Sequence, residues 1–161
     1  MSRELTREVL DALERRYPPP RWAFFRELRV GTGYEEHEYN LEQSMDAWAM
    51  NLYPSEGWKR IAFEVKVSRT DFWHEKCRPG KRETAIRLSN EFYFVTPTGL
   101  LFDGELPEDC GLIEVGMEAK ISVKAPWREA EPPPIPFVAS LARRIARQEQ
   151  VVLPETDKGL Q

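Results

Sequence analysis

The sequence predicts a single α/β domain in which helices flank a mixed β-sheet. Three observations support this fold class. A helix-like segment opens the chain, two strand-like segments joined by a short turn follow, and further helix-like and strand-like segments come after them. With 161 residues, 41% of them hydrophobic, the chain is long enough to build one sizeable core.

The first elements can be placed from periodicity and from proline. Residues 2–17 have apolar side chains every three or four positions, which predicts an amphipathic helix that ends at the three prolines 18–20. A first strand is expected over 21–30. A polar, acidic loop is expected over 31–43.

The next two strands are expected to form a β-hairpin. In residues 46–52 and 58–67, apolar residues recur at alternate positions, and β-branched and aromatic types are frequent. The turn Tyr53-Pro-Ser-Glu-Gly57 between them contains both proline and glycine, which favour turns.

This hairpin brings charged residues together. If it is symmetric about Ser55, Asp46 lies opposite Glu64, and Lys66 points to the same face because side chains alternate along a strand. Two carboxylates so placed repel each other unless a divalent cation lies between them. A neighbouring lysine would then stabilise developing negative charge.

The rest of the chain contains helices, short strands and a proline-rich segment. Ser68 and Asp71 have the spacing of a capping box, so a helix is expected over 69–77. The remaining expected elements are a helix over 81–88 after the break at Pro79-Gly80, strands over 91–96, 112–115 and 120–124, and a helix over 137–150. These boundaries predict a domain over 1–130, a stiff proline-rich linker over 131–136 and a C-terminal helix and tail over 137–161.

The D…E-x-K arrangement resembles the PD-(D/E)XK nuclease superfamily, and three further segments resemble its MmcB-like DNA repair and phage branch. Glu64-Val-Lys-Val-Ser-Arg-Thr-Asp-Phe72 is similar to the E-V-K-x-S-R-x-D-F core of that branch. Glu91-Phe-Tyr-Phe-Val-Thr-Pro97 contains its F-Y-F-x-x-P strand, and Leu106-Pro-Glu-Asp-Cys-Gly-Leu-Ile113 contains its P-E-x-x-G-L-I segment. The resemblance covers about residues 22–125; Met45 stands where related sequences often have arginine.

The resemblance implies a restriction-endonuclease-like fold and Mg²⁺- or Mn²⁺-dependent DNA cleavage. Asp46, Glu64 and the backbone carbonyl of Val65 would hold the metal, and Lys66 would act in catalysis. Glu27, on the neighbouring strand, would supply a third carboxylate. An outward-facing charge on that strand is the competing interpretation of Glu27.

The E-x-K triplet alone is weak support, because the chain contains a second one. Glu118-Ala-Lys120 lacks a preceding aspartate hairpin and is interpreted as ordinary surface. The triplet Glu64-Val-Lys66 differs from it in three ways. It belongs to the hairpin, a helix follows it, and the segments around it resemble those of the nuclease branch.

The charge distribution indicates where a nucleic acid would bind. The net charge is −4, but residues 57–90 contain nine basic and four acidic side chains. Local basic surface is what phosphate binding requires. The candidate contacts are Arg69, Lys76, Arg78, Lys81 and Arg82. A solvated basic turn is the alternative, and Arg143, Arg144 and Arg147 are expected to be a solvated helix face.

The expected function is therefore that of a DNA endonuclease, for which a repair or phage protein would supply targeting. The alternative is a non-cleaving nucleic-acid-binding or scaffold module that retains the nuclease fold. No apolar run is long enough to span a membrane, and the start of the sequence lacks a signal-peptide core, so a cytoplasmic protein is expected. The two cysteines are expected to be reduced thiols. The sequence does not predict the oligomeric state.

Overall fold

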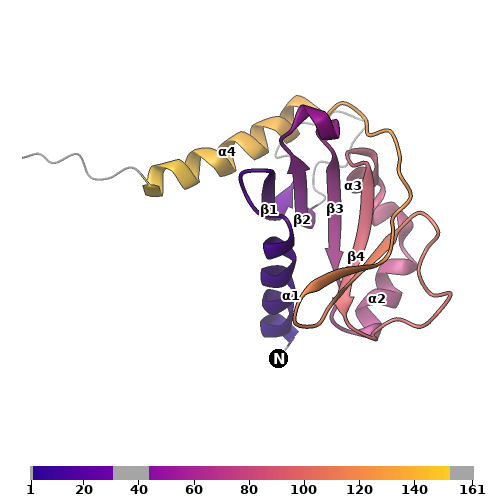
Figure 1. Ribbon diagram of the computed structural model, residues 1–161. Helices are drawn as coiled ribbons and strands as arrows, with labels where there is room; N and C mark the ends of the chain where they lie inside the picture. The colour runs from indigo at the N-terminus through magenta and orange to yellow at the C-terminus, as the bar shows by residue number, and fades with distance from the viewer. Residues whose placement is uncertain (1, 31–43, 153–161) are drawn as a thin grey trace, which may run out of the picture.

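A six-stranded mixed sheet forms the centre of the computed structural model, which describes residues 2–30 and 44–152 (Figure 1). The strands lie side by side in chain order: β1 (Trp22–Arg29), β2 (Ser44–Asn51), β3 (Arg60–Val65), β4 (Glu91–Pro97), β5 (Gly111–Val115) and β6 (Ala119–Val123). The pairs β3/β4 and β4/β5 are parallel, and the other neighbours are antiparallel. The predicted α/β class with a mixed sheet is confirmed.

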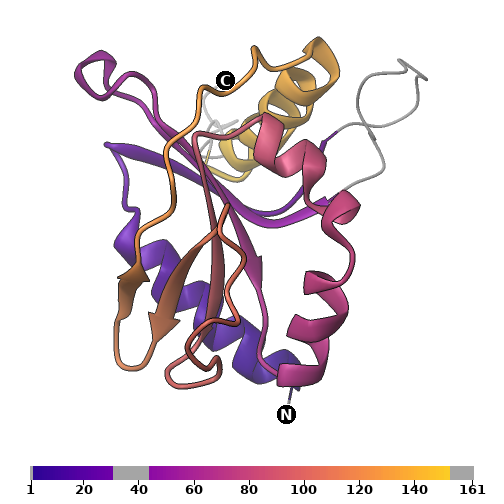
Figure 2. The same ribbon diagram turned by 90° about the vertical axis from the view of Figure 1, so that its right-hand side faces the viewer.

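Helices cover both faces of this sheet (Figure 2). Their bounds are α1 (Ser2–Arg16), α2 (Arg69–Lys76), α3 (Glu83–Arg87) and α4 (Ile135–Val152), with short 3₁₀ turns at Pro54–Glu56 and Pro79–Lys81. Helix α1 packs on one face through Val9, Leu10 and Leu13. On the opposite face α2, α3 and α4 contribute Phe72, Ala85 and Phe137 to the second core. The alternation of side chains along the strands supplies both cores.

The hairpin register is the one that the sequence predicts. Ala47 pairs with Phe63 and Met50 with Arg60, so the two strands are symmetric about Ser55. Gly57 supports the turn with a φ of 63°, in the left-handed region that glycine adopts without a steric penalty. The paired residues end at Ala47 and Phe63, and Asp46 and Glu64 are the next residues on the two strands.

The connection from β3 to its parallel neighbour β4 passes through α2 and α3. Ser68 begins α2, and its Oγ accepts a 3.2 Å hydrogen bond from the backbone N–H of Asp71, which confirms the predicted cap. The second helix is shorter than expected. It begins at Glu83 because Pro79–Lys81 forms a 3₁₀ turn first.

The C-terminal helix packs on the domain, which differs from the expected division at 131–136. The Phe137 side chain is completely buried, and its ring centroid lies 5.1 Å from that of Trp48 on β2. Before the helix, the backbone N–H of Glu131 donates to the carbonyl of Arg87 on α3. The proline-rich segment therefore lies against the domain, and the first turns of α4 belong to its core.

Two expectations lie outside the described residues: the acidic loop at 31–43 and the end of the tail at 153–161. Within the described ranges, no helix is long and apolar enough to cross a membrane.

Candidate active site

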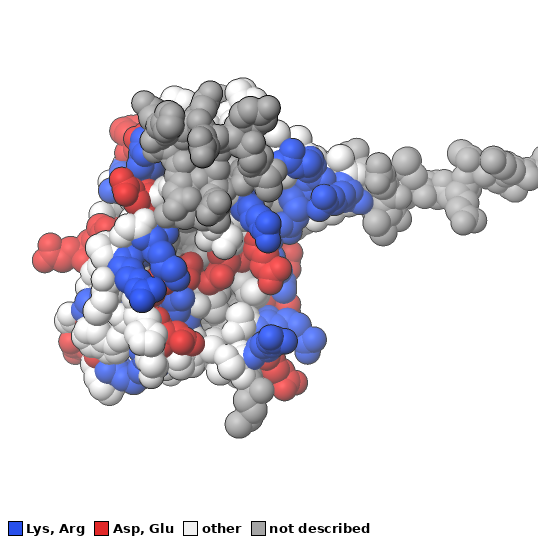
Figure 3. All heavy atoms as spheres, turned by 180° about the vertical axis from the view of Figure 1, so that it is seen from behind, with Lys and Arg blue, Asp and Glu red and all other residues white. Residues whose placement is uncertain are grey.

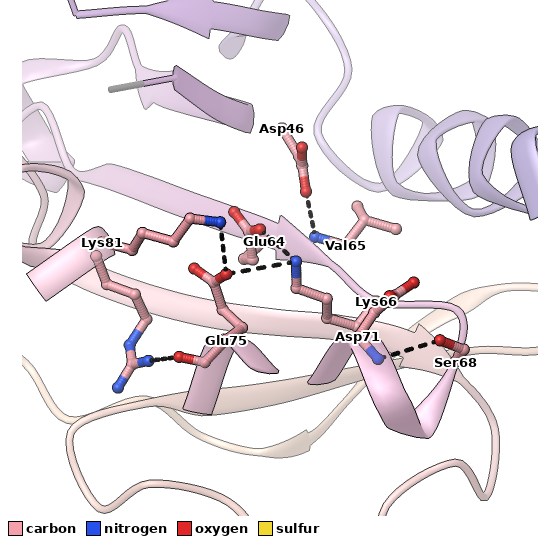
Figure 4. Close-up of polar contacts among 9 residues, drawn as sticks. Asp46, Glu64, Val65, Lys66, Ser68, Asp71, Glu75 and Lys81 are labelled. Carbon is pink, nitrogen blue, oxygen red and sulfur yellow. Dashed lines mark hydrogen bonds and ion pairs between the residues drawn. The ribbon is translucent and has the colours of Figure 1, made fainter. Parts of the chain in front are cut away.

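The charged residues predicted on the hairpin converge where β2 and β3 stop pairing (Figure 4). Asp46 is held by the backbone, because the N–H of Val65 donates a 2.8 Å hydrogen bond to its Oδ2. Glu64 lies on β3 and Lys66 directly follows this strand, both on the sheet face that α2 covers. Lys66 Nζ lies 2.7 Å from Glu64 Oε1, so these two side chains form an ion pair. The structure brings all three predicted residues together.

Glu75 on α2 is a fourth member of this site that sequence reasoning missed. Its side chain is only 6% exposed, and its Oε2 lies 3.7 Å from Lys66 Nζ and 3.3 Å from Lys81 Nζ. A signal was present in the sequence. Glu75 is three residues after Phe72, so both lie on the helix side that packs on the sheet.

Burial and mutual repulsion perturb the two hairpin carboxylates. Burial, with a smaller contribution from the charge of Asp46, raises the pKa of Glu64 to about 7. The pKa of Asp46 is also raised by burial, although the hydrogen bond from Val65 and the charge of Lys66 oppose this change. The negative charges of Glu75 and Glu27 add to the increase at Asp46. Both carboxyl groups are thus harder to ionise than they would be in water.

At Lys66, burial and the neighbouring charges have opposite effects on the pKa. Burial alone would lower its pKa, but the carboxylates of Glu64, Glu75 and Asp46 together outweigh burial and raise it. Lys66 therefore keeps its positive charge at neutral pH. It can stabilise an anion, and it cannot act as a proton acceptor there.

Glu27 lies beside the site on β1. Its neighbours Arg26 and Leu28 pair with Ala47 and Met45, so Glu27 stands across from Asp46. Its φ is 49°, an uncommon left-handed conformation for a residue with a side chain. The Glu27 side chain is exposed, in agreement with an outward-facing charge, and it still acts electrostatically on Asp46.

The donor set fits a hard divalent cation. Asp46 and Glu64 supply carboxylate oxygens, and a bound cation would offset both the burial and the mutual repulsion that raise their pKa values. Mg²⁺ is commonly held by one or two carboxylates, with water and substrate phosphates as further ligands. Within the described ranges, no three His, Cys, Asp or Glu side chains are arranged to hold a metal ion. Further ligands would thus be the Val65 carbonyl, water or substrate.

The predicted phosphate contacts fall into three groups: residues that already interact with a carboxylate or an aromatic ring, an exposed residue and a buried one. Arg69 pairs with Glu105 at 2.6 Å and lies over the Phe102 ring. Lys76 lies 4.7 Å from the Trp73 ring centroid, Lys81 pairs with Glu75, and Arg78 is exposed.

The expectation for Arg82 is corrected. Its side chain is buried, with 4% of the residue exposed, and its guanidinium donates to the backbone carbonyl of Glu75. Arg82 therefore holds α2 to the following turn and does not face solvent. The sequence suggested a phosphate contact because burial of an arginine cannot be recognised from a local run of basic residues.

Comparisons with known proteins place the fold and leave the function open. No protein-family model matches the sequence, and no curated protein matches it. A solved structure of a protein of unknown function from Silicibacter pomeroyi matches with a TM-score of 0.58 and 18% sequence identity, over 94% of each chain. This chain is thus similar in fold, along nearly its whole length, to a protein of unknown function.

Proposed function

We propose that this protein is a Mg²⁺- or Mn²⁺-dependent nuclease of the PD-(D/E)XK type that hydrolyses phosphodiester bonds in DNA. The observation that carries the proposal is the half-buried pair Asp46 and Glu64, both with raised pKa values, beside the ammonium of Lys66. Two such carboxylates are unfavourable by themselves and are balanced when a divalent cation binds.

Each residue has a distinct role in this proposal. Asp46, Glu64 and the Val65 carbonyl would hold the cation. When bound, the cation would act as a Lewis acid toward a phosphate and would lower the pKa of a water molecule. Lys66 holds a positive charge next to Glu64, where it would stabilise the charge that develops on the phosphate. Glu75 positions Lys66 from the side of α2.

The fold supports the same proposal without deciding it. A mixed sheet with helices on both faces is compatible with the restriction-endonuclease-like class that the sequence resemblance implies. The same resemblance favours a role in DNA repair or phage DNA processing. Because the net charge is −4, a partner protein that supplies targeting also fits.

A specific observation favours a second candidate, a non-cleaving nucleic-acid-binding or scaffold module. Lys66 is paired with Glu64, and Asp46 is hydrogen-bonded to the backbone, so the charged groups already satisfy one another in part. A retained site of this kind could stabilise the fold alone.

A cleavage assay separates the two candidates. Plasmid, duplex and single-stranded DNA would be incubated with the protein and Mg²⁺ or Mn²⁺, or with chelator. We expect cation-dependent cleavage that Lys66→Ala abolishes, with a larger effect on turnover than on binding. Lys120→Ala changes the exposed lysine of the second E-x-K triplet, and this matched control should cleave normally. DNA binding without cleavage by the wild type would favour the scaffold module.

A further inference from the structure

A basic pocket lies between β1 and α4, next to the candidate active site. It has a volume of about 340 Å³ and is lined by Glu27, Leu28, Arg29, Ser140, Arg143, Arg144 and Arg147. Figure 3 shows Lys and Arg side chains gathered along the projecting helix, beside a hollowed face with acidic side chains across its middle. We call these four arginines the α4 arginine cluster, Arg29 of β1 included.

Packing of α4 fixes the cluster in place. Phe137 is buried against Trp48, and Ser140 on the same helix side is also buried. Seven residues after Phe137, on that side again, Arg144 donates through Nη1 to the backbone carbonyl of Glu27 over 3.2 Å. Arg143 donates to Ser140 Oγ over 3.3 Å. The arginines thus stand at the end of a docked segment and not on a free helix.

The cluster has no acidic counterpart in the described part of the chain. Among the side chains that the structure describes, none offers a carboxylate oxygen within ion-pair distance of these four arginines, although Glu27 also lines the pocket. By contrast, Arg69 pairs with Glu105 at 2.6 Å, and Arg87 pairs with Glu131 at 2.9 Å. Guanidinium groups that converge without a counter-charge repel one another and favour a bound anion.

Glu27 connects the cluster to the active site. Its carbonyl accepts from Arg144, and the residue stands across from Asp46 in the pairing of β1 with β2. On the other side of the site, Arg82 is buried and Lys81 is occupied by Glu75. The α4 side therefore offers more guanidinium groups without carboxylate partners than the turn at 76–82 does.

We propose that the α4 arginine cluster binds the phosphate backbone of the nucleic acid whose scissile bond enters the site at Asp46 and Glu64. This inference rests on the proposed function, because it assigns the substrate path to the same site. Arg143 and Arg147 are one helical turn apart, about 6 Å along the axis, so they contact different phosphate oxygens along a strand. The hydrogen bond from Arg144 to the Glu27 carbonyl anchors this part of α4 and so orients Arg143 and Arg147.

The experiment measures binding independently of cleavage. The parent protein and all variants in this experiment carry Asp46→Asn. This substitution keeps an oxygen acceptor for the N–H of Val65 and removes a proposed metal ligand, so that the DNA is not cleaved. Affinity for a duplex DNA oligonucleotide is measured by fluorescence anisotropy against salt, with chelator present. Arg143→Ala/Arg147→Ala should lower the slope of log K against log salt by about 1.8, from about 0.9 for each phosphate contact.

Two variants serve as controls. Arg15→Ala/Lys120→Ala removes the same charge from exposed positions on α1 and on β6, the strand at the opposite edge of the sheet from β1. This pair should leave the slope unchanged. Arg143→Lys/Arg147→Lys keeps the charge and should restore most of the slope. Thermal melts of all variants report whether the fold is intact.

The outcomes are distinguishable. An unchanged slope for Arg143→Ala/Arg147→Ala, an equal loss in the control pair, or no binding by the parent protein would overturn the α4 assignment. If the binding results agree with the proposal and the wild type still cleaves no substrate with Mg²⁺ or Mn²⁺, the nuclease assignment fails and the binding surface stands.

Discussion

Glu75 Oε2 lies 3.7 Å from the ammonium of Lys66, although the two residues belong to different elements. Glu75 belongs to α2 and Lys66 directly follows β3, so the helix that comes after the E-x-K segment folds back over it. The lysine is thereby held between two carboxylates, those of Glu64 and Glu75. This contact makes α2 part of the site as well as of the core.

Removal of the Glu75 charge should change the acidity of the site. The negative charge of Glu75 contributes to the raised pKa values of Asp46 and Glu64, so Glu75→Gln should lower both. Because carboxylates must be deprotonated to bind a cation, the midpoint of Mn²⁺ affinity against pH should move to lower pH. Calorimetric titrations over a pH series would measure this midpoint.

Glu83→Gln on α3 is the control, because Glu83 is exposed. A midpoint that stays in place for Glu75→Gln, or moves equally for both variants, would mean that Glu75 has no electrostatic role at the site.

Glu64 should make the wild type less stable as pH rises. Its pKa is raised from 4.5 to about 7 in the folded state, so between these values the folded protein binds more protons than the unfolded chain does. The free energy of unfolding therefore falls as pH increases through this window, by up to roughly 3 kcal/mol. Urea unfolding at pH 5 and pH 8 would measure the change.

Glu64→Gln has no carboxyl group at this position and should lose less stability over the same pH range. Mn²⁺ at pH 8 should stabilise the wild type, because a ligand that binds only the folded state raises its stability, and should stabilise Glu64→Gln much less. Parallel pH profiles for the two proteins would argue against a raised pKa at Glu64.

Arg82 should matter for stability and not for DNA affinity. Its guanidinium donates over 3.0 Å to the Glu75 carbonyl and lies 5.5 Å from the Phe94 ring centroid. Arg82→Ala removes buried contacts and should cost about 1–3 kcal/mol in unfolding free energy. Lys81→Ala, whose parent side chain is 60% exposed, should cost much less. A fall in the salt dependence of DNA binding for Arg82→Ala, without lost stability, would contradict this assignment.

Local patterns were sufficient for the hairpin and for the cap of α2. The register around Ser55 follows from alternation and turn chemistry over about twenty residues, and both are visible in the sequence. Ser68 was recognisable as a cap because its partner Asp71 is three residues away. The meeting of Asp46, Glu64 and Lys66 followed from that register alone.

Features that depend on distant packing were not predictable in this way. Proline-rich sequence before Phe137 has the composition of a linker, and only its contact with Trp48, far away in the chain, makes α4 part of the core. Arg143 and Arg147 are exposed, as a solvated helix face predicts, but docking of α4 also places them at a pocket that Glu27 lines. Burial of Glu75 and Arg82 depends likewise on how α2 meets the sheet.

The central claim is that Asp46 and Glu64 together hold a divalent cation, and anomalous diffraction from a Mn²⁺-soaked crystal tests it most directly. We predict an anomalous peak about 2.0–2.4 Å from one oxygen of each carboxylate, as hard divalent cations require, and no such peak in Glu64→Gln. The crystal should be kept above pH 7, because Glu64 must be deprotonated to bind the cation and its pKa is about 7. Wild-type crystals with Mn²⁺ at other positions and none between these two carboxylates would contradict the claim.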